Sequence, residues 1–142
     1  MDIETAARIL REEGASLTIR LAQPDDGALK AALARFETAG ATVTGTPERI
    51  TGLCIQIGPV ELVGRSTGPV VLELRRFEAD EAGTRILFRV MASLGRGSGG
   101  EVILASVNRP DVKIFRYRPG GPGLDHVATG EVVAPYDAET DV

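Results

Sequence analysis

Tryptophan is absent from the 142-residue sequence, and aromatic residues make up only 4% of it. Apolar residues nevertheless account for 43% and charged residues for 25%, both ordinary values for a globular protein. The core must therefore be aliphatic. A chain of this length fits one domain, which buries roughly two-thirds of the surface that the unfolded chain exposes. We expect a single domain over residues 1–135, followed by an acidic C-terminal tail over residues 136–142.

Long apolar runs, a signal peptide and cysteine pairs are also missing. The longest apolar runs, such as residues 102–105, fall far below the roughly 20 residues that cross a bilayer. The start, Met1 to Glu4, has neither the basic residues nor the apolar stretch of a signal peptide. Cys54 is the single cysteine and cannot form an intrachain disulfide, which fits a reducing compartment. These absences predict a cytoplasmic protein without membrane contact.

Metal and cofactor motifs are poorly represented. One histidine and one cysteine exclude the usual structural zinc sites. The tail carboxylates Asp137, Glu139 and Asp141 lack the spacing and the glycine of an EF-hand calcium loop. Residues 95–100 match the dinucleotide pattern G-x-G-x-x-G, but the β-rich segment that follows opens no helix to hold a phosphate. We therefore expect no metal, no cofactor and a hairpin loop at 95–100.

Few side chains are available for catalysis. Nucleophilic catalysis needs a base near the nucleophile, and His126 is the only histidine. Asp125 could orient it, and Cys54 or a serine could face it. No G-x-S-x-G elbow or cysteine signature supports this arrangement, so a surface histidine in a turn before a strand is the simpler interpretation. Cys54, between apolar neighbours, fits a small buried side chain better than a reactive thiol.

Two amphipathic helices are predicted near the start. Apolar residues recur at helical spacing in residues 3–10 and again in the segment 26–39, where Leu29, Leu33 and Phe36 share one stripe. A glycine follows each segment, as is common at helix C-termini. Both segments therefore have the pattern of short helices with one apolar face.

The remainder of the chain is predicted to be rich in strands. Residues 16–22 alternate between apolar side chains and the polar Thr18 and Arg20, which is typical of a strand with one wet side. A hairpin turn is expected at residues 80–83. Two helices followed by many strands predict an α+β fold, in which two N-terminal amphipathic helices pack on a mostly antiparallel, curled sheet that could close into a barrel. The later strands are expected near residues 41–44, 51–57, 60–63, 69–77, 84–93, 101–107, 111–118 and 126–133.

Charge is sorted along the chain. Residues 84–118 hold seven basic and two acidic residues, a net charge of +5, although the whole chain is at −4. From residue 119 onward there is no Lys or Arg, and five acidic residues bring this part to −5. The sorting predicts a cationic surface that binds an anion, which could be the chain's own tail, another subunit, a nucleic acid or a small acidic ligand. We expect the tail to gain order only against such a surface.

The candidate binding residues lie on and just before a basic strand. Strand alternation places Lys113, Phe115 and Tyr117 on one face and two arginines on the other. Aromatic rings beside cations are how proteins stack single-stranded nucleic acids. The acidic net charge opposes a nucleic acid and favours a protein partner or a second copy of the chain. The candidates are Arg109, Lys113, Phe115, Arg116, Tyr117 and Arg118.

These patterns predict a non-catalytic assembly or protein-binding module, either a repeated subunit of a larger particle or a regulator of a partner. One alternative is a small enzyme that uses His126 in a ligand cavity under the sheet, and replacing His126 with Ala would distinguish it. The other alternative is a single-stranded nucleic-acid binder acting through residues 112–118. That alternative predicts salt-dependent retention of oligonucleotides.

Overall fold

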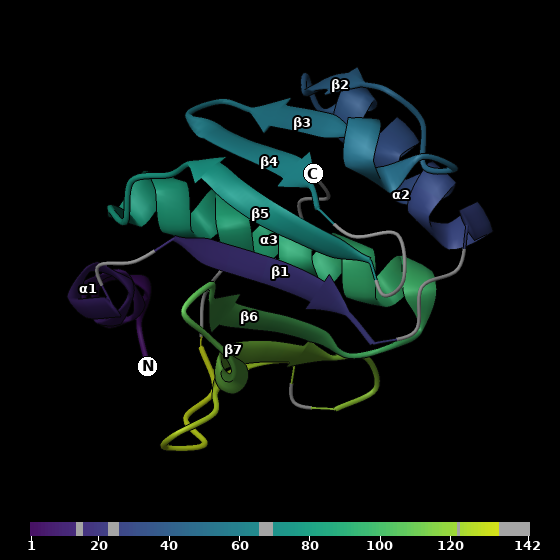
Figure 1. Cartoon of the computed structure of the whole chain (residues 1–142). Helices are drawn as coiled ribbons and strands as arrows, with labels where there is room; N and C mark the ends of the chain where they lie inside the picture. The colour runs from purple at the N-terminus through teal and green to yellow at the C-terminus, as the bar shows by residue number, and fades with distance from the viewer. Residues whose placement is uncertain (14–15, 23–25, 66–69, 122, 134–142) are drawn as a thin grey trace.

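The computed structural model describes residues 1–13, 16–22, 26–65, 70–121 and 123–133 (Figure 1). The acidic tail expected at residues 136–142 lies outside these described residues. The described helices are α1 (Ile3–Glu13), α2 (Asp26–Thr38) and α3 (Glu81–Ser98), with one 3-10 turn, η1 (Ile50–Gly52). The strands are β1 (Leu17–Leu21), β2 (Thr42–Thr44), β3 (Cys54–Ile57), β4 (Val60–Gly64), β5 (Val71–Arg76), β6 (Val102–Ser106), β7 (Arg109–Arg118) and β8 (Gly123–His126).

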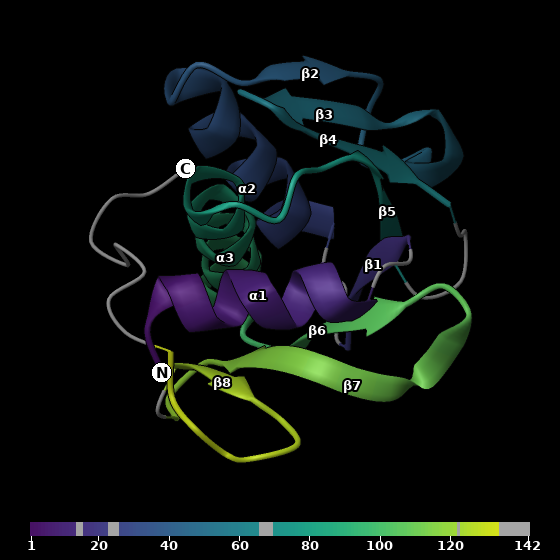
Figure 2. The same ribbon diagram turned by 90° about the vertical axis from the view of Figure 1, so that its left-hand side faces the viewer.

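The strands form one antiparallel sheet in the order β2-β3-β4-β5-β1-β6-β7-β8. The N-terminal strand β1 lies in the middle, where it pairs with β5 on one side and with β6 on the other. The sheet curls strongly around the helices but stays open, with β2 and β8 at its edges (Figure 2). The predicted α+β class and antiparallel sheet are confirmed, whereas closure into a barrel does not occur.

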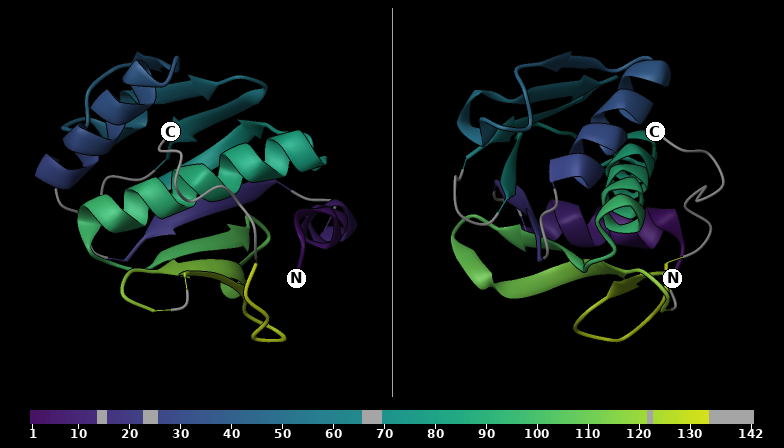
Figure 3. Two further views of the ribbon diagram at one scale, coloured as in Figure 1. Left: turned by 180° about the vertical axis from the view of Figure 1, so that it is seen from behind. Right: turned by 90° about the vertical axis from the view of Figure 1, so that its right-hand side faces the viewer.

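All three helices lie on the concave face of the sheet. Helix α3 is central and contacts both flanking helices and strands from both halves of the sheet. Figure 3 shows α1 and α2 on either side of α3. Since α1 and α2 lie near the start of the chain and α3 in its middle, the prediction of two N-terminal helices is right only in part.

Helices α1 and α2 form because each has one apolar stripe. In α1 the residues at helical spacing, Ile3, Ala6, Ala7 and Leu10, are all buried. In α2, Leu29, Leu33 and Phe36 are buried in the core, whereas Lys30 and Glu37 are exposed. The stripes predicted from the sequence therefore face the core.

Helix α3 overturns three predictions. The strand expected at 84–93 and the hairpins expected at 80–83 and 95–100 are wrong, because most of these residues belong to one helix of 18 residues. The helix packs on the sheet with one side and against α1 and α2 with others, so it is apolar around much of its circumference. Alternating apolar residues in such a helix imitate the period of a strand.

The ends of α3 carry ordinary helix signals. The Asp80 carboxylate accepts a hydrogen bond from the Gly83 N–H (2.7 Å) at the N-terminus. Gly99 takes the left-handed conformation, with φ of 70°, and ends the helix. Along its length Gly95 admits the Tyr117 ring, since a Cβ at that position would lie 2.2 Å from Cδ1 of the tyrosine. The glycine-rich segment therefore serves helix packing and termination.

Most of the remaining strand predictions are correct apart from their ends, but the strand predicted at 126–133 is wrong, because it shares only His126 with β8. The strand expected at 51–57 begins with the turn η1, and only its second half is β3. The last strand, expected at 126–133, instead ends at His126, and Val132 returns to the sheet only as an isolated bridge to Asp125. Within the described residues, no helix is both long and apolar enough to cross a membrane.

Candidate functional site

The outer face of the sheet, opposite the helices, is not covered by any element of the described residues (Figure 2). Strand alternation places Leu17, Ile19 and Leu21 of β1 in the core and leaves Thr18 and Arg20 on the outer face. In cross-strand register, Arg20 lies opposite Val71 on one side and Ile103 on the other. The middle of the outer face thus combines one arginine with apolar neighbours.

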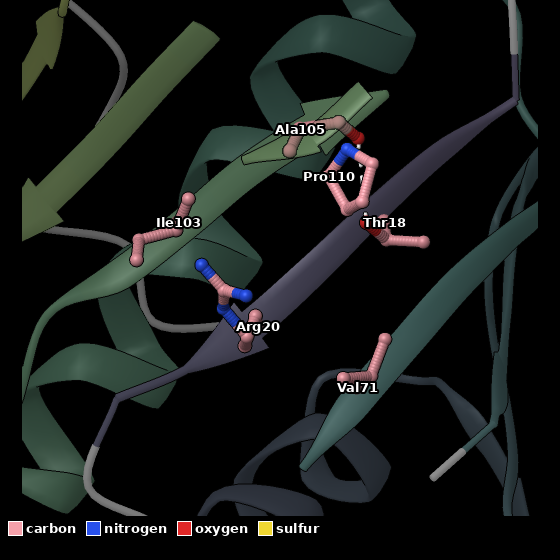
Figure 4. A pocket seen from close by; sticks show the side chains of 6 residues that line it. All are labelled: Thr18, Arg20, Val71, Ile103, Ala105 and Pro110. Atoms are coloured by element: carbon pink, nitrogen blue, oxygen red, sulfur yellow. Dashed lines mark hydrogen bonds between the residues drawn. The ribbon is translucent and has the colours of Figure 1, made fainter. Parts of the chain in front are cut away.

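A shallow hollow of about 60 Å³ lies at this position (Figure 4). Its floor is held by the strand pairing and by a weak hydrogen bond from the Thr18 hydroxyl to the Ala105 carbonyl (3.4 Å). Pro110 reaches the hollow because the register between β6 and β7 shifts on both sides of Ala105. The lining is mostly apolar and comes from four strands: Thr18, Arg20, Val71, Ile103, Ala105 and Pro110.

Arg20 differs from its charged neighbours in lacking a carboxylate. Other cations of the outer face are paired: Arg65 with Glu73 (2.5 Å), Arg75 with Glu61, Lys113 with Glu101 (3.4 Å), and both Arg116 (3.3 Å) and Arg118 (3.8 Å) with Asp125. Arg20 makes no hydrogen bond or ion pair to the described residues. Its cross-strand neighbours are apolar, so the strand register places no carboxylate opposite it.

The tip of the β6–β7 hairpin extends the apolar surface. Val107 and Val112 are 42% and 44% exposed, and they lie on either side of Pro110 in the chain. Arg109, between them, contacts Glu13 of α1 (3.0 Å). The hairpin tip therefore presents exposed valines next to the hollow, and its arginine is held by a helix on the other side of the sheet.

The predicted binding residues are divided between the two faces. Lys113, Arg116 and Arg118 lie on the outer face, but Phe115 and Tyr117 point into the core, where both are buried. The prediction that Lys113 shares a face with the two aromatic residues is wrong, because the irregularity in β7 displaces the alternation. The aromatic rings are therefore not available for stacking on a base in this structure.

The cations of the basic block are also largely paired within the fold. Arg109, Lys113, Arg116 and Arg118 have carboxylate partners from α1, β6 and β8. Asp125 is only 2% exposed and receives both neighbouring arginines. The charge sorting along the sequence consequently does not become one unpaired cationic face on β7.

His126 does not form the arrangement expected for a catalytic pair. Adjacent strand residues point to opposite faces, so Asp125 faces the arginines while the His126 ring lies 5.1 Å from the Phe115 ring. Nδ1 of His126 lies 3.0 Å from the Thr129 hydroxyl. Cys54 is on β3, six strand spacings of about 4.8 Å from β8 along the sheet. Neither Asp125 nor Cys54 therefore assists the histidine.

Other sites considered from the sequence have little support. The glycine-rich segment closes α3 and leads into β6, so it does not open a helix toward a phosphate. Among the described residues there is no group of three or more His, Cys, Asp or Glu side chains that could hold a metal ion. Sequence reasoning missed the hollow, although the polar positions Thr18 and Arg20 on a strand were the visible signal.

Comparison of the chain with protein-family models, with curated proteins and with solved structures finds no match. The functional proposal is built on the outer face, where the hollow lies beside Arg20, an arginine with no ion pair among the described residues.

Proposed function

We propose that the protein is a non-catalytic protein-binding module that holds its partner on the outer face of the sheet. The observation that carries this proposal is the apolar hollow beside Arg20, an arginine without a carboxylate in a face whose neighbouring cations are paired. An apolar recess with one oriented charge is a common form of a binding site for a side chain.

The chemistry of the hollow defines the partner. Val71, Ile103 and the Pro110 ring favour an aliphatic side chain, because they offer it apolar surface away from water. The guanidinium of Arg20 has five donors and binds a carboxylate in a planar, two-pronged geometry. We therefore expect a partner segment in which an aliphatic residue lies next to an aspartate, a glutamate or a terminal carboxylate.

The hollow is too small to be a whole interface, since a stable one buries about 800 Å² on each partner. The exposed valines of the hairpin tip extend its apolar part. The ion pairs Arg65–Glu73 and Lys113–Glu101 surround it, which matches the polar rim of known interfaces. Arg20 would then be a central contact, and arginine is enriched among residues that dominate binding energy.

A peptide selection tests the proposal. Random peptides displayed on phage would be selected on the immobilised protein, and the affinity of the enriched peptides would be measured by fluorescence polarisation. We expect an acidic residue beside an aliphatic one, and a weakening of at least about tenfold, or about 1.4 kcal/mol, in Arg20→Glu. Arg49→Glu is the matched control, because Arg49 is exposed and does not line the hollow. Equal binding to both variants would contradict the proposed site.

The molar mass in solution tests whether the partner is a second copy. A defined oligomer at micromolar concentration that dissociates in Arg20→Glu would support self-assembly through the outer face. A monomer at every concentration would point to a partner with another sequence. An oligomer that is unaffected by Arg20→Glu would place the contact elsewhere on the molecule.

A further inference from the structure

Three arginines form a stripe along one side of α3. Arg85, Arg89 and Arg96 recur at i, i+4 and i+11, so they lie within about 40° of one another around the helix axis. The left view of Figure 3 shows this helix running across the molecule between α1 and α2. Glu81 is the only acidic residue of α3, so the helix is cationic.

Arg89, in the middle of this stripe, has a side-chain N–H donor without a hydrogen-bond acceptor. Its Nε atom is buried and has no hydrogen-bond partner. A fourth arginine borders the stripe, because Arg35 of α2 donates to the carbonyl and the hydroxyl of Ser93 on α3 (both 3.1 Å). A buried guanidinium nitrogen beside further cations favours an anionic occupant.

The chain itself supplies an acidic segment near this surface. Val133 is fully buried, and its N–H donates to the Leu124 carbonyl (2.8 Å) on β8, a strand that contacts α3. The nine residues that follow lie outside the described part, and nine residues span up to about 30 Å when extended. Helix α3, with 18 residues, is about 27 Å long, so the segment can reach the whole stripe.

The overall lengths of the two charged sets are also similar. Asp137, Glu139 and Asp141 alternate, so an extended chain would carry the three carboxylates on one side at intervals of about 6.8 Å. The arginines of the stripe follow one another at about 6 Å and 10.5 Å along the helix axis. Both sets therefore extend over similar lengths, about 14 Å and 16 Å.

We propose that the acidic segment 136–142 binds the arginine stripe of α3 in the same molecule. Arg89 of the stripe has a buried Nε without a hydrogen-bond partner, whereas the cations that the sequence suggested on and near β7 are paired with Glu13, Glu101 and Asp125. The stripe is a surface for an acidic, extended chain, and the tethered tail occupies it at a high effective concentration.

A spin label on the intact chain measures this contact. The label would be attached at Thr140→Cys in a Cys54→Ser background, and the loss of amide NMR signals would be compared with the reduced label. We expect residues 85–96 to lose most of their intensity at low salt and to recover it at high salt, because screened ion pairs weaken. Mixing isotope-labelled protein without the label with unlabelled, spin-labelled protein would leave the signals intact, since the contact is intramolecular.

Two sets of variants identify the charges. Neutralising the tail with Asp137→Asn, Glu139→Gln and Asp141→Asn should abolish the effect, and these changes spare the helices and strands. Arg85→Glu, Arg89→Glu and Arg96→Glu together should do the same. The control with equal charge change is Lys30→Glu, Arg49→Glu and Arg76→Glu, at three exposed positions off the stripe, and it should keep the effect.

Other results would overturn the proposal. Signal loss concentrated on residues 109–118 would place the tail on β7. Loss that also appears in the mixed sample would make the contact intermolecular. The same signal loss in the neutral-tail variant as in the unmodified tail would exclude the carboxylates. The absence of any localised loss at low salt would exclude the docking altogether.

Discussion

The two faces of the sheet are built from the same strands but differ in burial and in the side chains that they carry. On the inner face, side chains such as Ile19, Leu72 and Leu104 are fully buried in the core. On the outer face, the residues between them form ion pairs or lie open around the hollow. Burial of apolar area on one face stabilises the fold, whereas the other face needs only to remain soluble and is free to carry recognition.

Strand β6 departs from this division. All five of its residues are buried, although Ile103 and Ala105 point to the outer face. Both line the hollow together with Pro110, which the irregular register between β6 and β7 brings to this face. These apolar residues lie beside Arg20, at the place where we propose binding.

The inner face should be the most sensitive to truncation. Phe36→Ala removes a fully buried ring between α2 and the rest of the core and should cost about 3–5 kcal/mol of unfolding free energy. Urea denaturation would measure it. Phe77→Ala is the control, since Phe77 is only partly buried, and it should cost clearly less. A loss below about 1 kcal/mol for Phe36→Ala would contradict the observed packing of α2.

Overpacking the inner face should also destabilise the protein. Gly95→Ala would ordinarily favour a helix by about 1 kcal/mol, but the added methyl would overlap the Tyr117 ring. We expect a net loss of about 1–2 kcal/mol, because overpacking costs more than the helix propensity contributes. In the background of Tyr117→Val the same substitution should be neutral or stabilising, and a double-mutant cycle would measure the difference. Equal effects in both backgrounds would show that the ring is not the obstacle.

On the outer face, the buried carboxylate of Asp125 should contribute more to stability than the carboxylates of the exposed ion pairs. Asp125→Asn removes the charge that faces Arg116 and Arg118 and should cost about 1–2 kcal/mol. Glu73→Gln, which removes the more exposed pair with Arg65, should cost less than about 1 kcal/mol. Thermal unfolding of both variants in the same buffer would rank them. The opposite ranking would mean that burial of Asp125 gives its contacts no advantage.

The smallest expected effect is a dependence on pH. The hydrogen bond from Arg75 lowers the pKa of Glu61 below its ordinary value of 4.5. This pair therefore adds stability that is complete above about pH 4.5 and is lost as the pH falls through the lower pKa of the folded state. An NMR titration of the Glu61 carboxyl should show the lowered pKa, and Arg75→Gln should raise it toward 4.5. A pKa of 4.5 or more in the unmodified protein would exclude the contribution.

Sequence patterns predicted the elements that have one clear environment. Helices α1 and α2 each bury a single stripe, and β1 alternates between the core and the outer face, so their periods are unambiguous. Helix α3 packs against the sheet and against two helices. Its sequence therefore lacks the sharply separated apolar and polar faces by which a helix is recognised. Asp80, an N-cap residue type, and Gly99, a glycine at the C-terminus of the segment, were the sequence signals that could have identified a helix instead of a strand.

The candidate site was less predictable because it depends on long-range pairing. The hollow combines residues of β1, β5, β6 and β7, which only the strand order brings together. The cations of β7 were predicted to seek an external anion, but Arg109 finds Glu13, which is 96 positions away in the chain. A pattern along one strand does not contain this information, whereas the register of the folded sheet does.

The central position of β1 also determines when the molecule can be completed during synthesis. Leu17 of β1 pairs with Ser106 of β6, so β1 cannot form this pairing until β6 has been translated. Strands β2 to β5 are joined by short connections and can assemble while β6 is still inside the ribosome. Until residue 106 emerges, one side of β1 is an unpaired edge that can recruit other nascent chains. Translation that pauses between β5 and β6 should therefore lower the yield of folded protein, even though no residue has been changed.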